Sequence, residues 1–188
     1  MRHLKIASVK DVKGILDIQQ ELLVPPSDLR EEDMSRGFLI HTTPRKLLED
    51  IILNPEKSFV LVSKDDDTVI GYVIVYRLNH WISLHAEWKN AVSNVDSSLV
   101  SFHDHEFYIQ HIARDPRYRG LGVSLLFGAK QEIINRGGTH LFGDILEKPV
   151  CNRASKEFHE KTLGAKKIGA YKEEPNLEWG IYRINFAE

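Results

Sequence analysis

The sequence has one cysteine in 188 residues, no long apolar run and no marked excess of either charge. Cys151 alone cannot form an internal disulfide, which is typical of proteins from a reducing compartment. No apolar segment approaches the roughly 20 residues of a membrane-spanning helix, and the first residues lack the apolar core of a signal peptide. The net charge of −2 gives no overall field that favours nucleic acid or an anionic membrane. We therefore expect a cytoplasmic protein that binds neither.

What remains is the composition of an ordinary globular protein. Hydrophobic residues make up 42% of the chain and charged residues 28%, and no internal repeat, low-complexity tract or linker divides it. A chain of this length can bury one sizeable core. We therefore expect residues 1–188 to form a single domain, present as a monomer or small oligomer, with a homodimer left open.

The spacing of apolar residues predicts strands and helices in a mixed order. The expected strands are residues 3–7, 58–63, 68–78, 106–113, 139–146, 165–171 and 180–186. The expected helices are residues 12–23, 44–53, 120–136 and 152–163. The order β-α-α-β-β-β-α-β-α-β-β is neither a strict β-α alternation nor an all-β pattern. It predicts an α/β protein with a mixed sheet and helices on both faces.

Residues 79–104 fit this pattern least well. Residues 82–95 are compatible with a helix that has Leu84, Trp88 and Val92 on one face. His103-Asp104-His105 suggests a metal site, but no third ligand is evident, so we favour a polar loop and expect no metal. Trp81 and Trp88 lack an accompanying basic stripe, so we expect them to pack or to cover the acceptor site rather than to contact nucleic acid.

The most informative stretch is Asp115–Leu126, which joins a predicted strand to a predicted helix. The first N–H groups of a helix lack internal partners and carry partial positive charge, so they bind anions. Gly120 and Gly122 would let a phosphate approach these amides. The stretch has neither the lysine of a Walker loop nor the spacing of a dinucleotide-binding fingerprint. The glycines alone leave an ordinary strand-to-helix turn open.

Two blocks together resemble the GNAT superfamily of acyl-CoA N-acyltransferases. Residues 119–124 are similar to its motif Arg/Gln-x-x-Gly-x-Gly/Ala, with Ser124 in the final position, and a competing frame from Arg117 lies outside the core motif. Residues 152–165 are similar to its Asn-x-x-Ala/Ser-x-x-Leu/Phe-Tyr/His-Glu-Lys-Leu-Gly-Phe, with Thr162 as one extra residue. The resemblance extends over essentially the whole chain, although the N-terminal third matches by element order only.

The resemblance implies the fold of this superfamily, with a splayed central strand and acetyl-CoA laid against it. The backbone of that strand would pair with the pantetheine arm like an added strand, and the glycine turn would hold the pyrophosphate. The residues implied in binding are Ile112, Ala113, Arg114, Arg119, Gly120, Leu121, Gly122, Val123, Ser124 and Asn152.

The implied reaction is transfer of an acetyl group from acetyl-CoA to a primary amine of a small molecule or peptide. A base must remove a proton from the amine, and the departing thiolate needs a donor. His159 stands where many relatives carry a tyrosine proposed as the general acid, and histidine can donate a proton near neutral pH. Glu147, five residues before Asn152, and His111, close to the splay, are candidate bases.

Two other carboxylates, Glu106 and Asp144, compete for the role of base. Cys151 is expected to be structural or incidental, because covalent catalysis by a thiol needs a paired base. Since the base is ambiguous, a second class of function stays open. The chain would then be a sensor or partner module that binds acyl-CoA without catalysis.

Overall fold

The computed structural model describes residues 2–35, 37–95 and 105–186. The strands are β1 (Arg2–Ile6), β2 (Ser58–Asp65), β3 (Thr68–Arg77), β4 (Glu106–Arg114), β5 (His140–Lys148), β6 (Lys166–Glu174) and β7 (Leu177–Asn185). The helices are α1 (Val12–Leu22), α2 (Arg45–Leu53), α3 (Leu78–Leu84), α4 (Ala86–Val95), α5 (Leu121–Asn135) and α6 (Arg153–Glu157). Short 3-10 turns precede α1 and lie between α1 and α2.

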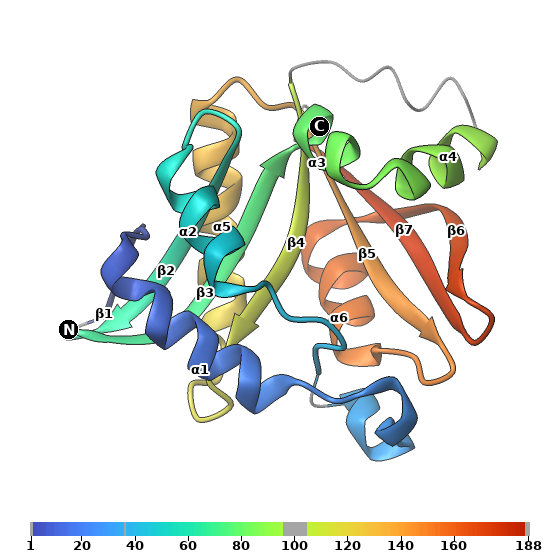
Figure 1. The fold of residues 1–188 in the computed structure, drawn as a ribbon, viewed down its shortest axis with the longest axis horizontal. Helices are drawn as coiled ribbons and strands as arrows, with labels where there is room; N and C mark the ends of the chain where they lie inside the picture. The colour runs from blue at the N-terminus through green and yellow to red at the C-terminus, as the bar shows by residue number, and fades with distance from the viewer. Residues whose placement is uncertain (1, 36, 96–104, 187–188) are drawn as a thin grey trace.

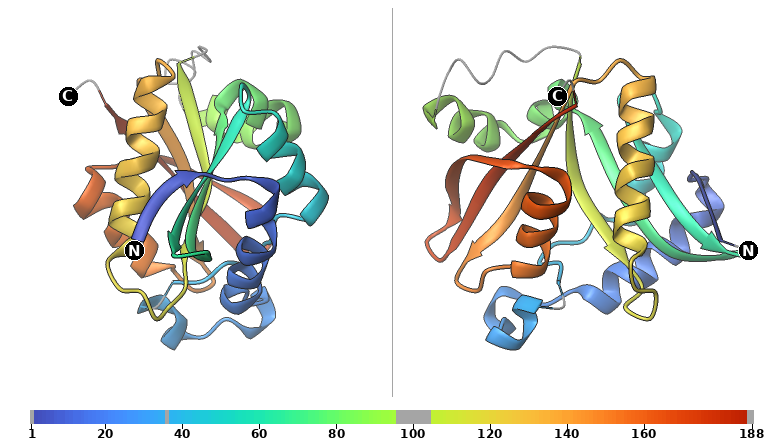
Figure 2. Two further views of the ribbon diagram at one scale, coloured as in Figure 1. Left: turned by 90° about the vertical axis from the view of Figure 1, so that its left-hand side faces the viewer. Right: turned by 180° about the vertical axis from the view of Figure 1, so that it is seen from behind.

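The strands of the described chain form one sheet in the order β1-β2-β3-β4-β5-β7-β6 (Figure 1). β4 and β5 are parallel, whereas every other neighbouring pair in this sheet is antiparallel. Helices cover both faces, with α1 and α2 on one side and α5 on the other (Figure 2). The predicted mixed α/β architecture is confirmed.

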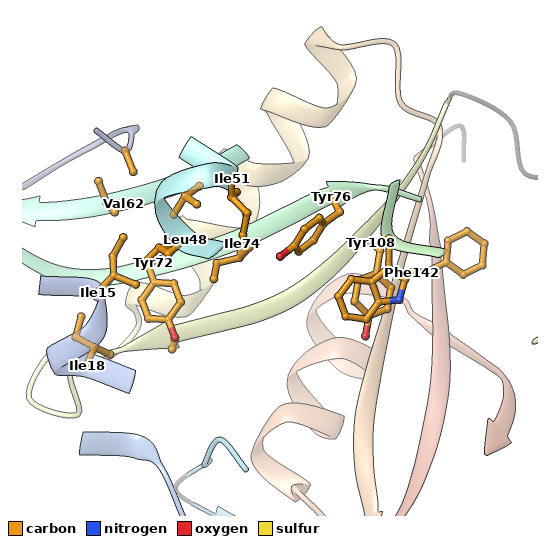
Figure 3. Close-up of a cluster of buried hydrophobic side chains, with 14 of the residues drawn as sticks. Ile15, Ile18, Leu48, Ile51, Val62, Tyr72, Ile74, Tyr76, Tyr108 and Phe142 are labelled. Atoms are coloured by element: carbon orange, nitrogen blue, oxygen red, sulfur yellow. The ribbon is translucent and has the colours of Figure 1, made fainter. Parts of the chain in front are cut away.

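Apolar side chains explain why these helices pack where they do. Figure 3 shows the face under α1 and α2, where the labelled side chains are Ile15, Ile18, Leu48, Ile51, Val62, Tyr72, Ile74, Tyr76, Tyr108 and Phe142. On the other face, one side of α5 meets the sheet through Leu126, Ala129 and Ile133. β3 is buried on both faces, and its apolar run Val69–Tyr76 therefore has no polar alternation.

The central strands separate, and this feature positions the site. β4 and β5 pair only from Glu106–His140 to Ile109–Gly143. Beyond that point β4 remains paired with β3 as far as Arg114, while β5 continues against β7. Residues 110–114 therefore have an edge toward β5 without a strand partner, and Figure 1 shows the two strands diverging there. This is the expected splay.

The segment between β3 and β4 differs from the prediction. It contains two helices, α3 and α4, separated at His85, where the backbone is not helical. Leu84 is exposed, so the predicted apolar face over residues 82–95 is not continuous. Next to this break, Trp81 stacks on Tyr108 of β4 with the ring centroids 4.0 Å apart and on His85 with the ring centroids 3.8 Å apart.

The suggested histidine–aspartate metal site lies mostly beyond what the structure describes. His103 and Asp104 are outside the described residues. His105 Nδ1 donates to the carbonyl of Gly137 at 2.9 Å, which ties the start of β4 to the turn after α5. In the described ranges, no group of three or more metal-binding side chains comes together.

The extra residue in the second block changes the helix geometry. After α6, the chain continues as a π-helical turn over Phe158–Thr162. A π turn accommodates one residue more than an α turn, and such turns are frequent at functional sites. The additional residue marked by Thr162 is therefore absorbed within the helix without displacing Asn152 at its start.

Candidate functional site

A cavity of about 950 Å³ follows the unpaired edge of β4. At one end it is lined by the end of β4 and the start of α5, through Ile112, Ala113, Arg114, Gly120, Gly122 and Val123. One side is formed by α6 and the turn after it, through Asn152, Ser155, Phe158 and His159. At the other end it is lined by aromatic and acidic side chains, including Trp81, Trp88, Tyr108, Asp144, Tyr171 and Glu173.

The start of α5 has the backbone of an anion site. Gly120 precedes the helix with φ 77°, a left-handed conformation that favours glycine. A side chain on Gly122 would begin 3.9 Å from the ring of Phe158 and would narrow the cavity. The amides of the first turn lack helical partners, apart from a 3.3 Å contact from Val123 N–H to the Gly120 carbonyl. A phosphate can therefore reach these N–H groups.

The other predicted residues of this turn lie differently. Leu121 is buried against Ile70 and Leu125, so only its backbone is available to a ligand. Arg119 and Ser124 are exposed, and neither side chain lines the cavity.

Arg117 is held by a neighbouring carboxylate. Its Nε donates to Asp115 Oδ1 at 2.9 Å, and this hydrogen bond lowers the pKa of Asp115. The arrangement agrees with a motif frame that begins at Arg119 rather than at Arg117.

A β-bulge in β4 turns two successive side chains to one face. The register shifts from Val75–Ile109 to Ile74–His111, which leaves Gln110 as the extra residue. Gln110 Oε1 accepts a hydrogen bond from Tyr76 at 3.2 Å, while the ring of His111 meets that of Tyr72 edge-on. Tyr72 and Tyr76 belong to the same core cluster, so Gln110 and His111 both point toward it.

His111 is a buried imidazole with an unused nitrogen. The side chain lines the cavity at 8% exposure, and Nδ1 has no hydrogen-bond partner within the described chain. Burial lowers its pKa to about 4, from an ordinary value of 6.5. The ring is therefore neutral near pH 7 and can accept a proton from a group in the cavity.

His159 also lines the cavity, and its tautomer follows from its partner. Nδ1–H donates to the backbone carbonyl of Ser155 at 2.8 Å, because a carbonyl can only accept. Nε2 is then the ring nitrogen that carries a lone pair in the neutral form. Burial lowers the pKa of this histidine, although the bond to Ser155 opposes the shift.

Asn152 lines the cavity and caps α6. Its Oδ1 accepts from Ser155 N–H at 3.2 Å, and its Nδ2 donates to the Phe38 carbonyl at 3.1 Å. The side chain therefore fixes α6 against the segment before α2.

The two carboxylates Glu147 and Glu106 lie away from the cavity lining. Glu147 forms an ion pair with Lys167 at 2.5 Å and accepts from Tyr182 at 3.0 Å. Burial alone would raise its pKa, but these hydrogen bonds lower it. Glu106 is buried. The structure thus brings His111 and His159 to one cavity and leaves Glu147 outside it.

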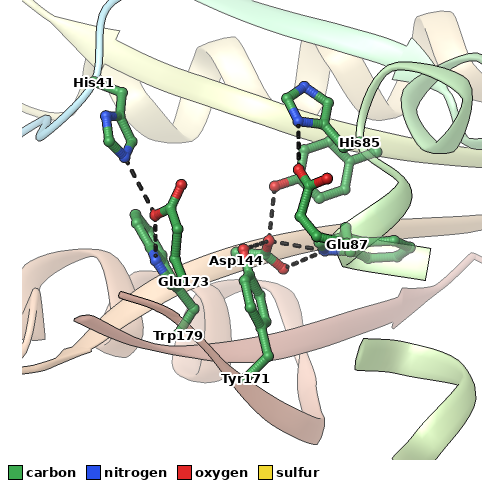
Figure 4. Close-up of polar contacts among 9 residues, drawn as sticks. His41, His85, Glu87, Asp144, Tyr171, Glu173 and Trp179 are labelled. Carbon is green, nitrogen blue, oxygen red and sulfur yellow. Dashed lines mark hydrogen bonds and ion pairs between the residues drawn. The ribbon is translucent and has the colours of Figure 1, made fainter. Parts of the chain in front are cut away.

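Asp144 is the carboxylate that faces the cavity. Its oxygens accept from Trp88 Nε1 at 2.8 and 3.0 Å, Tyr108 at 3.0 Å and Tyr171 at 2.9 Å (Figure 4). Its surroundings are largely protein, and this burial raises its pKa to about 6. These donors come from α4, β4 and β6, so local sequence patterns gave no signal beyond the presence of the aromatic residues.

Two acidic–histidine pairs lie at the same end of the cavity (Figure 4). Glu173 contacts His41 at 3.3 Å and also accepts from Trp179 Nε1 at 2.9 Å. His85 contacts Glu87 at 3.2 Å. The hydrogen bond with Glu173 raises the pKa of His41, and the same bond lowers the pKa of Glu173.

Cys151 is partly buried, and burial raises the pKa of its thiol. A thiol with a raised pKa is a poor nucleophile.

None of the described helices is both long and apolar enough to cross a membrane.

Comparison with known proteins agrees with this geometry. Residues 24–165 match the model of the acetyltransferase (GNAT) family, and the chain therefore belongs to that family. None of the curated proteins compared with the chain matches it.

Several solved structures share the fold over nearly the whole length. An N-acetyltransferase from Staphylococcus aureus Mu50 is 16% identical, with a TM-score of 0.65 and 98% of each chain covered. The PaiA N-acetyltransferase from Thermoplasma acidophilum, solved with coenzyme A, is 12% identical, with a TM-score of 0.63 and 99% of each chain covered. The putative acetyltransferase YncA from Salmonella typhimurium, solved with acetyl-CoA, is 15% identical, with a TM-score of 0.65 and coverage of 100% of this chain and 95% of that one.

Proposed function

We propose that this protein is an N-acetyltransferase that moves an acetyl group from acetyl-CoA to a primary amine. The observation that carries the proposal is one cavity joining the unpaired edge of β4, the N-terminus of α5 and a polar end. Family membership and the coenzyme A and acetyl-CoA complexes of similar structures support the choice of co-substrate.

The residues present fit an acyl-CoA. The free backbone of Ile112, Ala113 and Arg114 suits an extended, amide-containing arm, because such an arm pairs as an added strand. The first amides of α5 suit the pyrophosphate, with Gly120 and Gly122 leaving room. When bound, acetyl-CoA supplies the activated acetyl thioester.

We assign His111 the role of general base. It is neutral near pH 7 and its ring lines the cavity, so it can take a proton from the incoming amine. Glu147 is another of the predicted candidates, but its ion pair with Lys167 and its place outside the cavity lining do not support that role.

His159 remains the candidate general acid. Its Nε2 must first hold a proton, and the lowered pKa then makes that proton easy to give up to the departing thiolate. Ser155 positions the ring by fixing Nδ1 as the donor to its carbonyl.

The proposal is tested by two measurements on the wild-type chain. Calorimetric titration with acetyl-CoA is expected to show binding, and thiol release is expected to rise when amines are added. The absence of binding at high micromolar acetyl-CoA would contradict the proposal. Binding without any acetylated product across small amines, amino acids and peptides would instead indicate the non-catalytic sensor or partner module.

A further inference from the structure

The far end of the cavity carries more negative charge than its own side chains balance. Three carboxylates, Glu87, Asp144 and Glu173, line this end, whereas Arg114 is the one lysine or arginine among the described residues that line the cavity. Arg114 Nη1 donates to the carbonyls of Asp115 and Pro116, which places its charge at the α5 end.

Asp144 is the deepest of these charges, and its partners are neutral. Trp88, Tyr108 and Tyr171 donate hydrogen bonds to it, and no lysine or arginine of the described chain forms an ion pair with it. A buried carboxylate is costly unless a positive group accompanies it. Because Asp144 faces the cavity, a cationic ligand can supply that group.

Aromatic rings stand around the same carboxylate. Trp88 meets Tyr108 edge-on with centroids 5.4 Å apart, and Trp81 stacks face to face on Tyr108 with centroids 4.0 Å apart. Ring faces attract alkylammonium groups, and their apolar surface suits a methylene chain. At the more exposed rim, the ion-pair partners of Glu173 and Glu87 in the described structure are histidines, His41 and His85.

A second feature of the cavity points independently to a polar ligand. His111 is more than nine-tenths buried, lines the cavity, and has Nδ1 without a hydrogen-bond partner in the described chain. β4 and β5 part at Ile109 and Gly143. Asp144 is the first residue of β5 beyond this last pair, and His111 is the second residue of β4 beyond it. The two residues therefore lie on opposite strands beside the opening.

We propose that the acceptor is a slender alkyl amine with a second ammonium group, a diamine or polyamine, whose distal cation is bound by Asp144 with Glu173 at the rim. The reacting amine then lies toward His111, and the methylene chain lies along the aromatic rings. This inference rests on the proposed function for the transfer step, but the recognition of the dication does not depend on turnover.

The test compares acceptors of matched length, namely 1,4-diaminobutane, 4-aminobutanol and 4-aminobutyrate. Their binding to the coenzyme A complex is measured by calorimetry, and their acetylation is followed by thiol release. The diamine is expected to bind at least about tenfold more tightly than the amino alcohol, with the amino acid weakest. Equal binding of diamine and amino alcohol would overturn the inference, whether or not turnover occurs.

Variants test which carboxylates recognise the second ammonium group. Asp144→Asn is expected to remove most of the preference for the diamine and to leave binding of the amino alcohol within about twofold. Glu173→Gln, at the exposed rim, provides the same comparison with a smaller loss if Asp144→Asn fails to fold. Asp17→Asn, on exposed α1, is the control and keeps the full preference. A preference that survives both cavity variants would contradict the assignment. Diamine binding with no acetylated product would contradict the proposed function while leaving the dication site intact.

Discussion

Burial shifts His111 and Asp144 toward their neutral forms, but with opposite signs. The pKa of the imidazole falls to about 4, whereas the pKa of the carboxyl rises to about 6. Near pH 7 the histidine is therefore neutral, while the carboxyl is charged at an energetic cost. One residue can accept a proton and the other can hold a cation, as the proposed acetyl transfer to an amine requires.

Replacement of His111 tests its role as the base. His111→Gln should lower kcat by about 10²- to 10⁴-fold, because the amine loses its positioned proton acceptor. The affinity for acetyl-CoA, measured by calorimetry, should stay unchanged because the backbone of β4 remains. His105→Gln, at an exposed histidine, is the control. Full activity of the His111 variant would remove this residue from the mechanism.

The raised pKa of Asp144 predicts a dependence of stability on pH. The carboxyl titrates at about 6 in the folded protein, against an ordinary value of 3.8. Its contribution to stability is present below pH 3.8 and is lost as the pH rises through 6, because the folded state holds the proton more tightly. From pH 5 to pH 7, the free energy of unfolding of the wild type should fall by about 1 kcal/mol relative to Asp144→Asn.

Urea unfolding of both proteins at these two pH values checks that difference. The comparison between the two proteins cancels groups that titrate in both, His111 included. A difference that does not change with pH would show that the environment of Asp144 is not desolvated as described.

At the scale of elements, the turn into α5 contains motif residues that line the cavity and motif residues that do not. Gly122→Val should weaken acetyl-CoA binding at least about tenfold, because its methyl groups would enter the cavity beside Phe158. Ser124→Val, two residues further along the same helix and outside the cavity lining, should bind normally. Calorimetry on both variants decides the matter, and equal affinities would contradict the placement of the phosphate-binding amides.

The π turn after α6 predicts an unusual tolerance to deletion. Removal of Thr162 should let the helix continue with ordinary α geometry, so the free energy of unfolding should change by less than about 1 kcal/mol. Deletion of Lys156, which lies in the α-helical part of the same element, should destabilise the protein by several times as much. Urea unfolding compares the two, and similar losses would contradict this reading of the π turn.

The sequence predicted the turn into α5 and the helix after Asn152 because the signals for both are local. Gly120, Gly122 and the Asn152 block carry the turn and the helix, and Thr162 already appeared as one residue too many. Asp144 could not be placed in the same way. Its partners Trp88, Tyr108 and Tyr171 lie on three separate elements, and only the packing of α4 and β6 around the splay brings them together.

The bulge in β4 was equally out of reach of the sequence. Strand alternation alone puts His111 on one face with Ala113. The additional turn of Gln110 to that face depends on its pairing with β3 and on its bond to Tyr76. Local patterns therefore predicted residues at the α5 end of the cavity, whereas the aromatic and acidic end depends on contacts between distant parts of the chain.

At the scale of the whole molecule, the cavity lies where the sheet divides. The β1-β2-β3-β4 part and the β5-β7-β6 part share only four residue pairs between β4 and β5. Asp144 adds a second connection, since it is on β5 and accepts from Trp88 and Tyr108 of the first part of the chain. A ligand bound along β4 would bridge the same opening, so binding and the cohesion of the sheet are linked.

Amide hydrogen exchange with and without acetyl-CoA tests the central claim most directly. The amides of residues 110–114 that face β5 and those of residues 120–123 should exchange freely in the isolated protein and become protected in the complex. Strands β1 and β2, far from the opening, serve as the internal reference and should not change. Protection confined to another surface, or none at saturating acetyl-CoA, would contradict the account.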